Sequence, residues 1–268
     1  MMGLWRLLFR LICAAVLMFL IAPILAVIPL SFSSNSILSY PLPGLSLRWY
    51  ESVLTSPKWY VAFANSMIIG VAATVASVVL GTLASFGLAR RKGWVASSIR
   101  VLILSPMIVP IVLVAVALYL FLAPLQLTNT MAGMILAHIV VAVPFVVIPV
   151  LTAIEQLDDN LGRAAAACGA RPITAFWRVT LPSISSAMAS GALFAFAASF
   201  DDVVIALFVA GPDQRTLPRE MYSGLRETIS PELTAVATIM MAFSTFLFLL
   251  MQTLQRRRRR MMQSAVRH

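Results

Sequence analysis

The sequence predicts an all-α, polytopic membrane protein with six transmembrane helices. Of its 268 residues, 60% are hydrophobic and only 11% are charged, whereas about 25% of the residues of a soluble domain are charged. About six apolar runs are long enough to cross roughly 30 Å of hydrocarbon. Basic residues gather in alternate connections between these runs. Together these three observations favour a membrane protein over every soluble class.

The apolar runs predict where the chain crosses the membrane. They occupy residues 11–30, 63–88, 101–122, 132–154, 184–210 and 233–254. Arg6 and Arg10 precede the first run, as they would in a signal peptide. Pro23 and Pro29, without a small-x-small cleavage site before Ser31, favour a retained first span.

The connections suggest three parts. Residues 1–60 hold the first helix and an external loop, 61–254 the membrane core with a cytoplasmic segment near 155–182, and 255–268 a basic tail. The external loop is rich in serine and proline. Its aromatic residues favour anchoring at the lipid–water interface over substrate binding. They are Trp49, Tyr50, Trp59 and Tyr60.

The distribution of basic residues predicts the orientation. Of 20 Lys and Arg, 15 lie before residue 11, in 90–100, in 155–182 or after 255. The positive-inside rule then places these segments and both termini in the cytoplasm. The net charge of +10 therefore reflects topology and not nucleic-acid binding. The run Arg256–Arg260 is expected to contact anionic membrane lipid.

Small residues and prolines mark the middle runs. The second run carries small residues at helical spacing, which predicts a close packing surface, either within the chain or toward a second membrane subunit. They are Gly70, Ala73, Ser77, Gly81, Ala84, Ser85 and Gly87. Pro106 and Pro110 in the third run, and Pro144 and Pro149 in the fourth, predict either bent helices around a polar path or ordinary kinks.

The connection from Glu155 to Pro182 predicts a short helix-turn-helix outside the bilayer. Ala164 to Ala167 strongly favours helix. Gly169 suits a left-handed cap that ends this helix, and Pro172 suits the first turn of a second one. Small side chains at the tip would let the segment enter a cleft on a partner protein.

Asp201 and Asp202 are the only acidic residues inside an apolar run. A carboxylate at the centre of a lone inserted helix costs about 2.5–3.5 kcal/mol, so a functional or paired role is expected. Neighbouring helical residues diverge by about 100°, so we expect one carboxylate to face a solute path and the other to pair or to cap a helix. Phe194, Phe196 and Phe200 favour packing, with a cation–π contribution from Phe200 as the alternative.

The segment after the fifth run shows a stripe of apolar residues spaced by four. Leu217, Met221, Leu225 and Ile229 predict a short amphipathic helix on the outer face.

The sequence contains no motif for nucleotide binding, for hydrolysis or for metal binding. The chain has no Gly-Lys dipeptide for a phosphate-binding loop, and no hydrolase or zinc-protease motif. Cys13 and Cys168 imply no disulfide framework, and His138 and His268 are too few for a metal site. We therefore expect a non-catalytic chain without a cofactor or a metal, whose energy source lies on another polypeptide.

The cytoplasmic segment resembles the coupling motif of ATP-binding cassette importer permeases. The matching residues are Ala164, Ala165, Gly169, Val179, Leu181 and Pro182, while the glutamate of the motif falls on Arg163. Residues 200–205, 208–211, 216–218, 222–223 and 230–232 resemble the spermidine/putrescine type of these permeases. The resemblance covers roughly residues 61–254 and is specific across 164–232.

The resemblance implies a type I importer permease with a MetI-like fold in the cell inner membrane. Its expected partners are a dimer of cytoplasmic ATPases, a second and related permease, and an extracytoplasmic solute-binding protein. Coupling to the ATPase would fall on Arg163, Ala164, Ala165, Gly169, Ala170, Val179, Leu181 and Pro182. The solute path would involve Asp201, Asp202 and Phe200, and the cargo would be a polyamine or a similar small cation.

Two alternatives remain at this point. The same machine could carry an opine or another small organic solute. A stand-alone secondary carrier is the other, although it leaves the cytoplasmic helix pair unexplained. Glu155, Asp158 and Asp159 could replace the missing glutamate of the motif or pair with Arg163.

Overall fold

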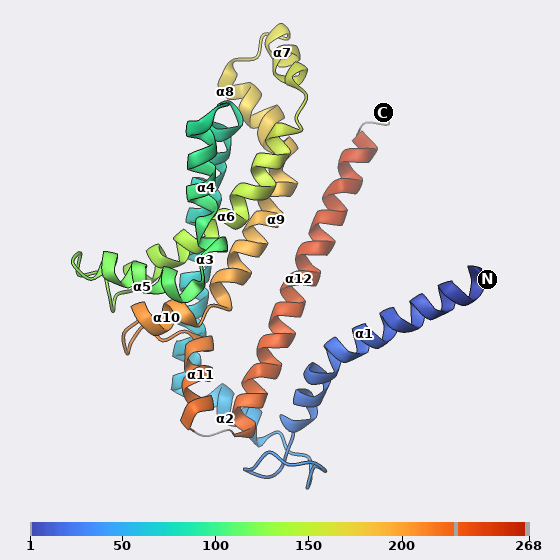
Figure 1. The fold of residues 1–268 in the computed structure, drawn as a ribbon, viewed down its shortest axis with the longest axis vertical. Helices are drawn as coiled ribbons and strands as arrows, with labels where there is room; N and C mark the ends of the chain where they lie inside the picture. Colours follow the sequence, from blue (N-terminus) through green and yellow to red (C-terminus); the bar gives the residue numbers. More distant parts are fainter. Residues whose placement is uncertain (1, 228–229, 266–268) are drawn as a thin grey trace. The chain divides into compact units, whose positions relative to one another are not determined.

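The computed structural model describes residues 2–227 and 230–265. The chain forms two compact units, Met1–Tyr60 with Met221–Thr245, and Val61–Glu220 with Phe246–His268. Within the described residues every regular element is a helix, and one isolated bridge joins Ser33 to Leu45 (Figure 1). The predicted all-α class is confirmed.

The first unit contains α1 (Met2–Leu30), α2 (Arg48–Thr55) and the beginning of α12 (Pro231–Ala265). Side-chain hydrogen bonds hold its loop and helices together. The indole Nε1 of Trp59 donates to Glu232 Oε1 at 2.7 Å, and that of Trp49 donates to the Ser33 carbonyl at 2.8 Å. Trp49 and Trp59 therefore fix this unit through internal hydrogen bonds, whereas Tyr60 is 72% exposed, as an interfacial anchor requires.

The second unit is built on three long helices, α3 (Pro57–Ala89), α6 (Met131–Glu155) and α9 (Leu181–Phe200). The small residues of α3 pack within the chain. Ala73, Ser77 and Ser85 are fully buried, and a Cβ added at Gly81 would lie 2.9 Å from Val146 of α6. Of the three glycines in this set, Gly87 has open space beside it, whereas Gly70 faces Phe196 of α9 and Gly81 faces Val146 of α6. The inward-facing part of this surface therefore binds α6 and α9, and not a second subunit.

The third apolar run is not one continuous span. It divides into α4 (Trp94–Ile108) and α5 (Ile111–Leu122), which meet at an angle of 110°. Pro110 lies at the break with extended backbone, and the amide of Val109 still donates to Ser105 O at 2.9 Å. The prolines of α6 do not break it, because Pro144 and Pro149 both lie inside a continuous helix. A proline thus stands at a helix break in the third apolar run, whereas the prolines of the fourth run leave the helix continuous.

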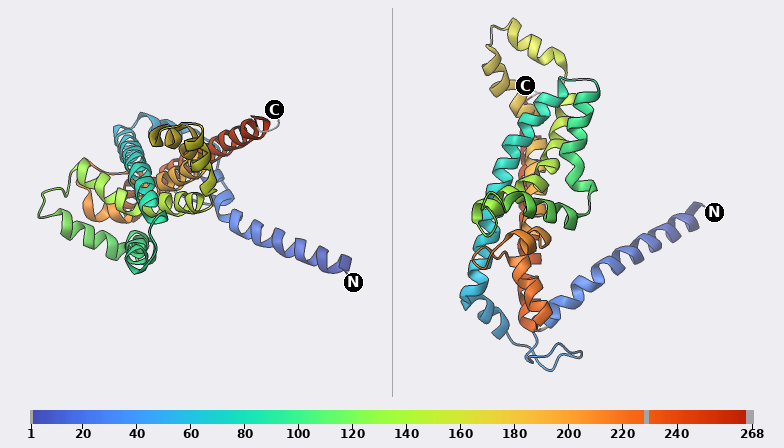
Figure 2. Two further views of the ribbon diagram at one scale, coloured as in Figure 1. Left: turned by 90° about the horizontal axis from the view of Figure 1, so that it is seen from above. Right: turned by 60° about the vertical axis from the view of Figure 1, so that its left-hand side comes forward.

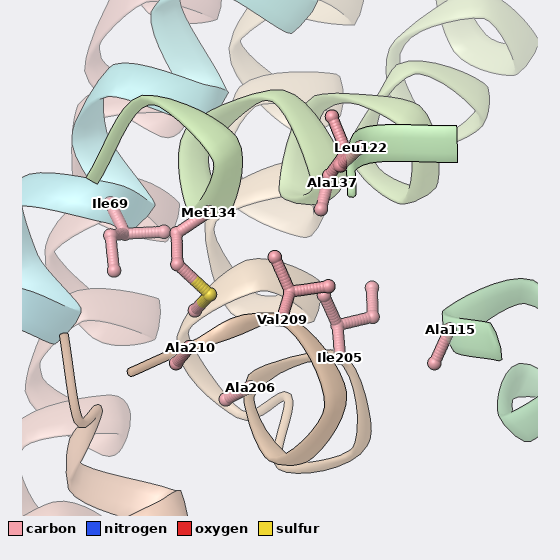
Figure 3. Close-up of a cluster of buried hydrophobic side chains, with 9 residues drawn as sticks. All are labelled: Ile69, Ala115, Leu122, Met134, Ala137, Ile205, Ala206, Val209 and Ala210. Atoms are coloured by element: carbon pink, nitrogen blue, oxygen red, sulfur yellow. The ribbon is translucent and has the colours of Figure 1, made fainter. Parts of the chain in front are cut away.

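The fifth apolar run is also interrupted. Helix α9 ends at Phe200, and the short helix α10 (Val204–Val209) follows after three residues. Figure 3 shows Ile205 and Val209 of α10 gathered with Met134 and Ala137 of α6 in a buried apolar cluster. The same cluster includes Ala115 and Leu122 of α5. Thus α10 is held by packing against α5 and α6 and does not continue α9.

Helix α11 (Leu217–Glu227) occupies most of the predicted amphipathic segment. Leu217 is buried, Leu225 is 54% exposed, and Ile229 lies outside the described residues.

Among residues 2–227 and 230–265, five helices are long and apolar enough to cross a membrane, and the bent pair α4–α5 brings the number to six if it counts as one span. The predicted polytopic membrane class is confirmed.

The close approach of α9 to α6 gives a stability test. A Cβ on Gly191 would lie 2.9 Å from the Val146 Cα. We expect Gly191→Ala to lower the melting temperature of the purified protein, because overpacking costs about 1–3 kcal/mol. The matched Gly87→Ala has open space and should leave the melting temperature unchanged or slightly higher. Equal melting temperatures for the two variants would contradict this packing.

Candidate functional site

The predicted helix-turn-helix lies beyond one end of the α6–α9 pair, with α10 toward the other end (Figures 1 and 2). Its first helix is α7 (Asp159–Ala167). The Asp158 carboxylate caps it by accepting from the Asn160 amide at 2.9 Å. Gly169 ends it with φ of 77°, while Ala170 N donates to Ala165 O at 3.0 Å and Gly169 N donates to Ala166 O at 2.9 Å. This pair of bonds is a Schellman motif, and Gly169 provides the left-handed cap that the sequence predicted.

The second half of the segment, after Gly169, is helical as well. It comprises α8 (Pro172–Ala175), with Pro172 in its first turn, and the π-helical turn η1 (Phe176–Thr180). The Leu181 amide donates to Phe176 O, one residue further back than in an α-helix. Pro182, the second residue of α9, has no amide hydrogen to donate. The predicted Leu-Pro pair therefore stands where a π-helical turn changes into the long helix α9.

The tip of this segment is exposed. Arg163, Ala164 and Gly169 lie at the surface, and Ala165 and Ala170 are half-buried. Large apolar side chains are exposed in the second half of the segment, with exposed fractions of 62% for Ile173 and 60% for Trp177. At the base of the segment, Val179 and Leu181 are half-buried and Pro182 is exposed. The segment thus presents small and apolar groups together on a part of the chain that lies beyond the long helices.

Two of the three acidic residues before the tip, Glu155 and Asp158, are engaged elsewhere. Glu155 forms a salt bridge of 2.9 Å with Arg100 of α4, and Asp158 caps α7. Neither pairs with Arg163, and the side chain of Asp159 lies outside the described residues. No described residue accepts a hydrogen bond from the Arg163 guanidinium. The segment therefore carries an exposed positive charge where the motif has a negative one.

The two membrane aspartates have different environments. Asp202 is half-buried, and its Oδ2 accepts from the amides of Ile205 at 2.9 Å and Ala206 at 3.4 Å. It therefore caps α10, which is the structural role that the sequence left open. Asp201 is the last residue of the α9 ladder, is exposed, and accepts no hydrogen bond from the described residues. Of this pair, Asp201 has the carboxylate that is exposed and has no hydrogen-bond donor among the described residues.

The phenylalanines of α9 also differ in exposure. Phe200 is buried and stacks on Phe196, with ring centroids 5.4 Å apart. Phe194 is 55% exposed. The burial of Phe200 favours packing over contact with a solute.

Two polar sites in the spans were not found from the sequence. His138 of α6 is fully buried, and its Nδ1 lies 2.8 Å from the Ser199 Oγ of α9. Asn65 of α3 donates from Nδ2 to the carbonyls of Asp213 and Arg215, at 2.8 and 3.0 Å. The first joins α6 to the end of α9 beside Asp201, and the second holds the loop between α10 and α11. A polar residue inside an apolar run was the available signal in both places.

The metal-ligating residue types do not gather. Among residues 2–227 and 230–265, no group of three or more His, Cys, Asp or Glu side chains could hold a metal ion.

Comparison with known proteins gives one family. A family model described as binding-protein-dependent transport system inner membrane component matches residues 77–261. The chain is 33% identical over 230 residues to the putrescine transport system permease protein PotI of Escherichia coli (strain K12), covering 83% of this chain and 82% of that protein. It is 29% identical over 246 residues to the spermidine/putrescine transport system permease protein PotC of the same strain, covering 90% and 91%.

A solved structure has the same fold. It is that of a bacterial ABC transporter involved in the import of the acidic polysaccharide alginate. The TM-score is 0.70 at 15% identity, covering 95% of this chain and 96% of that one.

The left-handed residue at the end of α7 gives a local prediction. Gly169→Ala should weaken the cap, because a side chain in this conformation costs roughly 1–2 kcal/mol. Hydrogen exchange of the α7 amides in the purified protein should become faster. Gly162→Ala, inside α7 with open space around it, should slow the same exchange. Faster exchange in both variants would contradict the assigned cap.

Proposed function

This chain belongs to the family of binding-protein-dependent transport system inner membrane components, and from this premise we propose that it carries a polyamine or a similar small cation into the cytoplasm. It is the membrane permease subunit of an ATP-binding cassette importer and is not itself an enzyme, since ATP hydrolysis belongs to a partner ATPase.

Coupling to the ATPase is assigned to the segment from α7 to the start of α9. The observation that carries this assignment is a segment with small exposed residues at its tip, Ala164 and Gly169, and exposed apolar side chains in its second half, Ile173 and Trp177. Apolar groups displayed beyond the membrane helices are expected to be covered by a partner. Small residues let the backbone seat deeply, and the Schellman motif stiffens the turn. Closure of the ATPase dimer would then move this segment and, through η1, the long helix α9.

The orientation follows from the same assignment. The coupling segment must face the ATPase, so the basic connection at 90–100 and both termini lie in the cytoplasm, in accord with the distribution of Lys and Arg. The loop between α10 and α11 is then external, where an extracytoplasmic binding protein would deliver its solute.

The cargo is assigned from two sources. Two relatives are named for putrescine or for spermidine and putrescine. Asp201 offers an exposed carboxylate with no partner among the described residues, which would favour a cation over an anion. The solved structure of the same fold belongs to an importer of an acidic polysaccharide, so the fold by itself does not select the charge of the cargo.

The assembly is tested by purification and reconstitution. The tagged permease should co-purify with an ATPase and with a second, related permease. Proteoliposomes with all these subunits and the binding protein should accumulate putrescine or spermidine when ATP is supplied, whereas the chain by itself should not. The isolated binding protein should be titrated with putrescine, spermidine and opines. Accumulation by the chain alone would favour a secondary carrier.

The aspartates give the cargo test. Asp201→Asn should reduce uptake of a cationic solute several-fold, because it removes the exposed charge. Asp202→Asn is the matched control and should retain most uptake, because asparagine caps a helix about as well as aspartate. Initial uptake rates are compared at equal membrane expression. Unchanged uptake in Asp201→Asn would remove the proposed solute contact.

The coupling segment gives a second pair of variants. Arg163→Glu should leave transport within a few-fold of the parent, because the exposed guanidinium has no hydrogen-bond partner among the described residues. Ala164→Arg, at the adjacent exposed position, should abolish ATPase co-purification, because a long side chain prevents the tip from seating. If Arg163→Glu abolished assembly and Ala164→Arg did not, the proposed contact face would be wrong.

A further inference from the structure

A cavity lies at the base of the coupling segment. Its volume is about 820 Å³, within the range of about 300–1,000 Å³ typical of ligand sites. It lies between the end of α3, the start of α4, the α6–α7 junction and the start of α9. Its lining includes Arg90, Arg91 and Lys92 on one side and Leu157 and Leu161 on the other.

The carboxylates that the structure describes around the cavity do not balance its cationic side chains. Four cationic side chains line it, namely those of Arg90, Arg91, Lys92 and Arg100, against two carboxylates, those of Glu155 and Asp158. The salt bridge to Arg100 occupies Glu155, and the capping bond of α7 occupies Asp158. No described carboxylate therefore pairs with Arg90, Arg91 or Lys92. An anion is the ligand that such a cavity lacks.

The surroundings point to a lipid as the source of that anion. Trp94, the first residue of α4, is 80% exposed, and an indole at a helix end is typical of the lipid–water interface. Further along α4, Ile99 is 40% exposed and Leu102 is 71% exposed. An anionic headgroup in the cavity would therefore have an uncovered apolar helix face beside it for its acyl chains.

From this combination we infer that the cavity binds the phosphate headgroup of an anionic phospholipid, such as phosphatidylglycerol or cardiolipin. Arg90, Arg91 and Lys92 supply the charge, and α4 supplies the apolar track. Basic pockets at the cytoplasmic ends of membrane helices are suited to such headgroups. The inference rests on the proposed orientation. A bound lipid would join the α3–α4 connection to the α6–α7 junction and so brace the base of the coupling segment.

The test uses the full chain in phosphatidylcholine vesicles that contain a minor proportion of brominated phosphatidylglycerol. Bromine quenches nearby indole fluorescence. The chain has 5 Trp residues including Trp94, so the difference in quenching between the parent and Trp94→Phe gives the contribution of Trp94. We expect stronger quenching of Trp94 by brominated phosphatidylglycerol than by brominated phosphatidylcholine. The measurement needs neither ATPase nor solute, so its failure is distinct from a failure of the transport proposal.

The variants locate the site. Arg90→Gln/Arg91→Gln should raise the proportion of phosphatidylglycerol needed for half-maximal quenching about tenfold. Arg90→Lys/Arg91→Lys keeps the charge and should restore binding, which shows that the fold survives substitution there. Arg171→Gln/Arg178→Gln removes the same charge from exposed positions outside the cavity and should have no effect.

Three outcomes would overturn the inference. An equal effect of the two Gln pairs would mean diffuse attraction to the membrane. Absence of any preference for phosphatidylglycerol would leave the cavity to an acidic segment of a partner protein. Relief of quenching by inorganic phosphate, beyond that by chloride at equal ionic strength, would assign the site to a soluble phosphate.

Discussion

The backbone in a hydrocarbon layer must satisfy its own hydrogen bonds, and the breaks in this chain follow that constraint. Each interruption of a membrane helix is repaired locally. Before α10 the Asp202 carboxylate accepts the amide of Ile205. At the α4–α5 break, Leu113 N donates to the Pro110 carbonyl. The amide of Asn129 donates to the carbonyl of Val209 at 2.9 Å, which closes the end of α10. Of the two acidic residues in this apolar run, Asp202 is thus explained by the backbone that it caps.

Because of that constraint, the two adjacent aspartates have different hydrogen-bonding roles. Asp202 accepts hydrogen bonds from two amides, so backbone donors within the chain already stabilise part of its negative charge. Asp201 ends α9, where the helix carbonyls leave partial negative charge, and its own carboxylate adds to it. Both contributions favour a cation at this point. Beside it, the hydrogen bond between His138 and Ser199 ties the end of α9 to α6, so the position of Asp201 is set by buried packing.

The sequence predicted those features that depend on local chemistry. The cap at Gly169 and the first-turn Pro172 need only nearby residues, and both were found where expected. The outcome at prolines was not predictable from the residue type, because Pro110 stands at a helix break while Pro144 lies inside a continuous helix. The same holds for the small residues of α3, since spacing shows that a face packs closely but not against which helix. The charge-lined cavity draws residues from four separated segments, a proximity that no linear pattern contains.

The geometry of α9 joins the two ends of the proposed mechanism. It runs unbroken over 20 residues from Leu181 to Phe200, about 30 Å at ~1.5 Å per residue. Its contact with α6 is close, because Gly191 brings the backbones together at Val146. If an ATPase moved α7 and α8, the close contact between α9 and α6 would favour a joint motion of these two helices. Helix α10 packs separately, against α5 and α6. A displacement of the coupling segment would therefore reach Asp201, where the long helix α9 ends and the separately capped helix α10 follows.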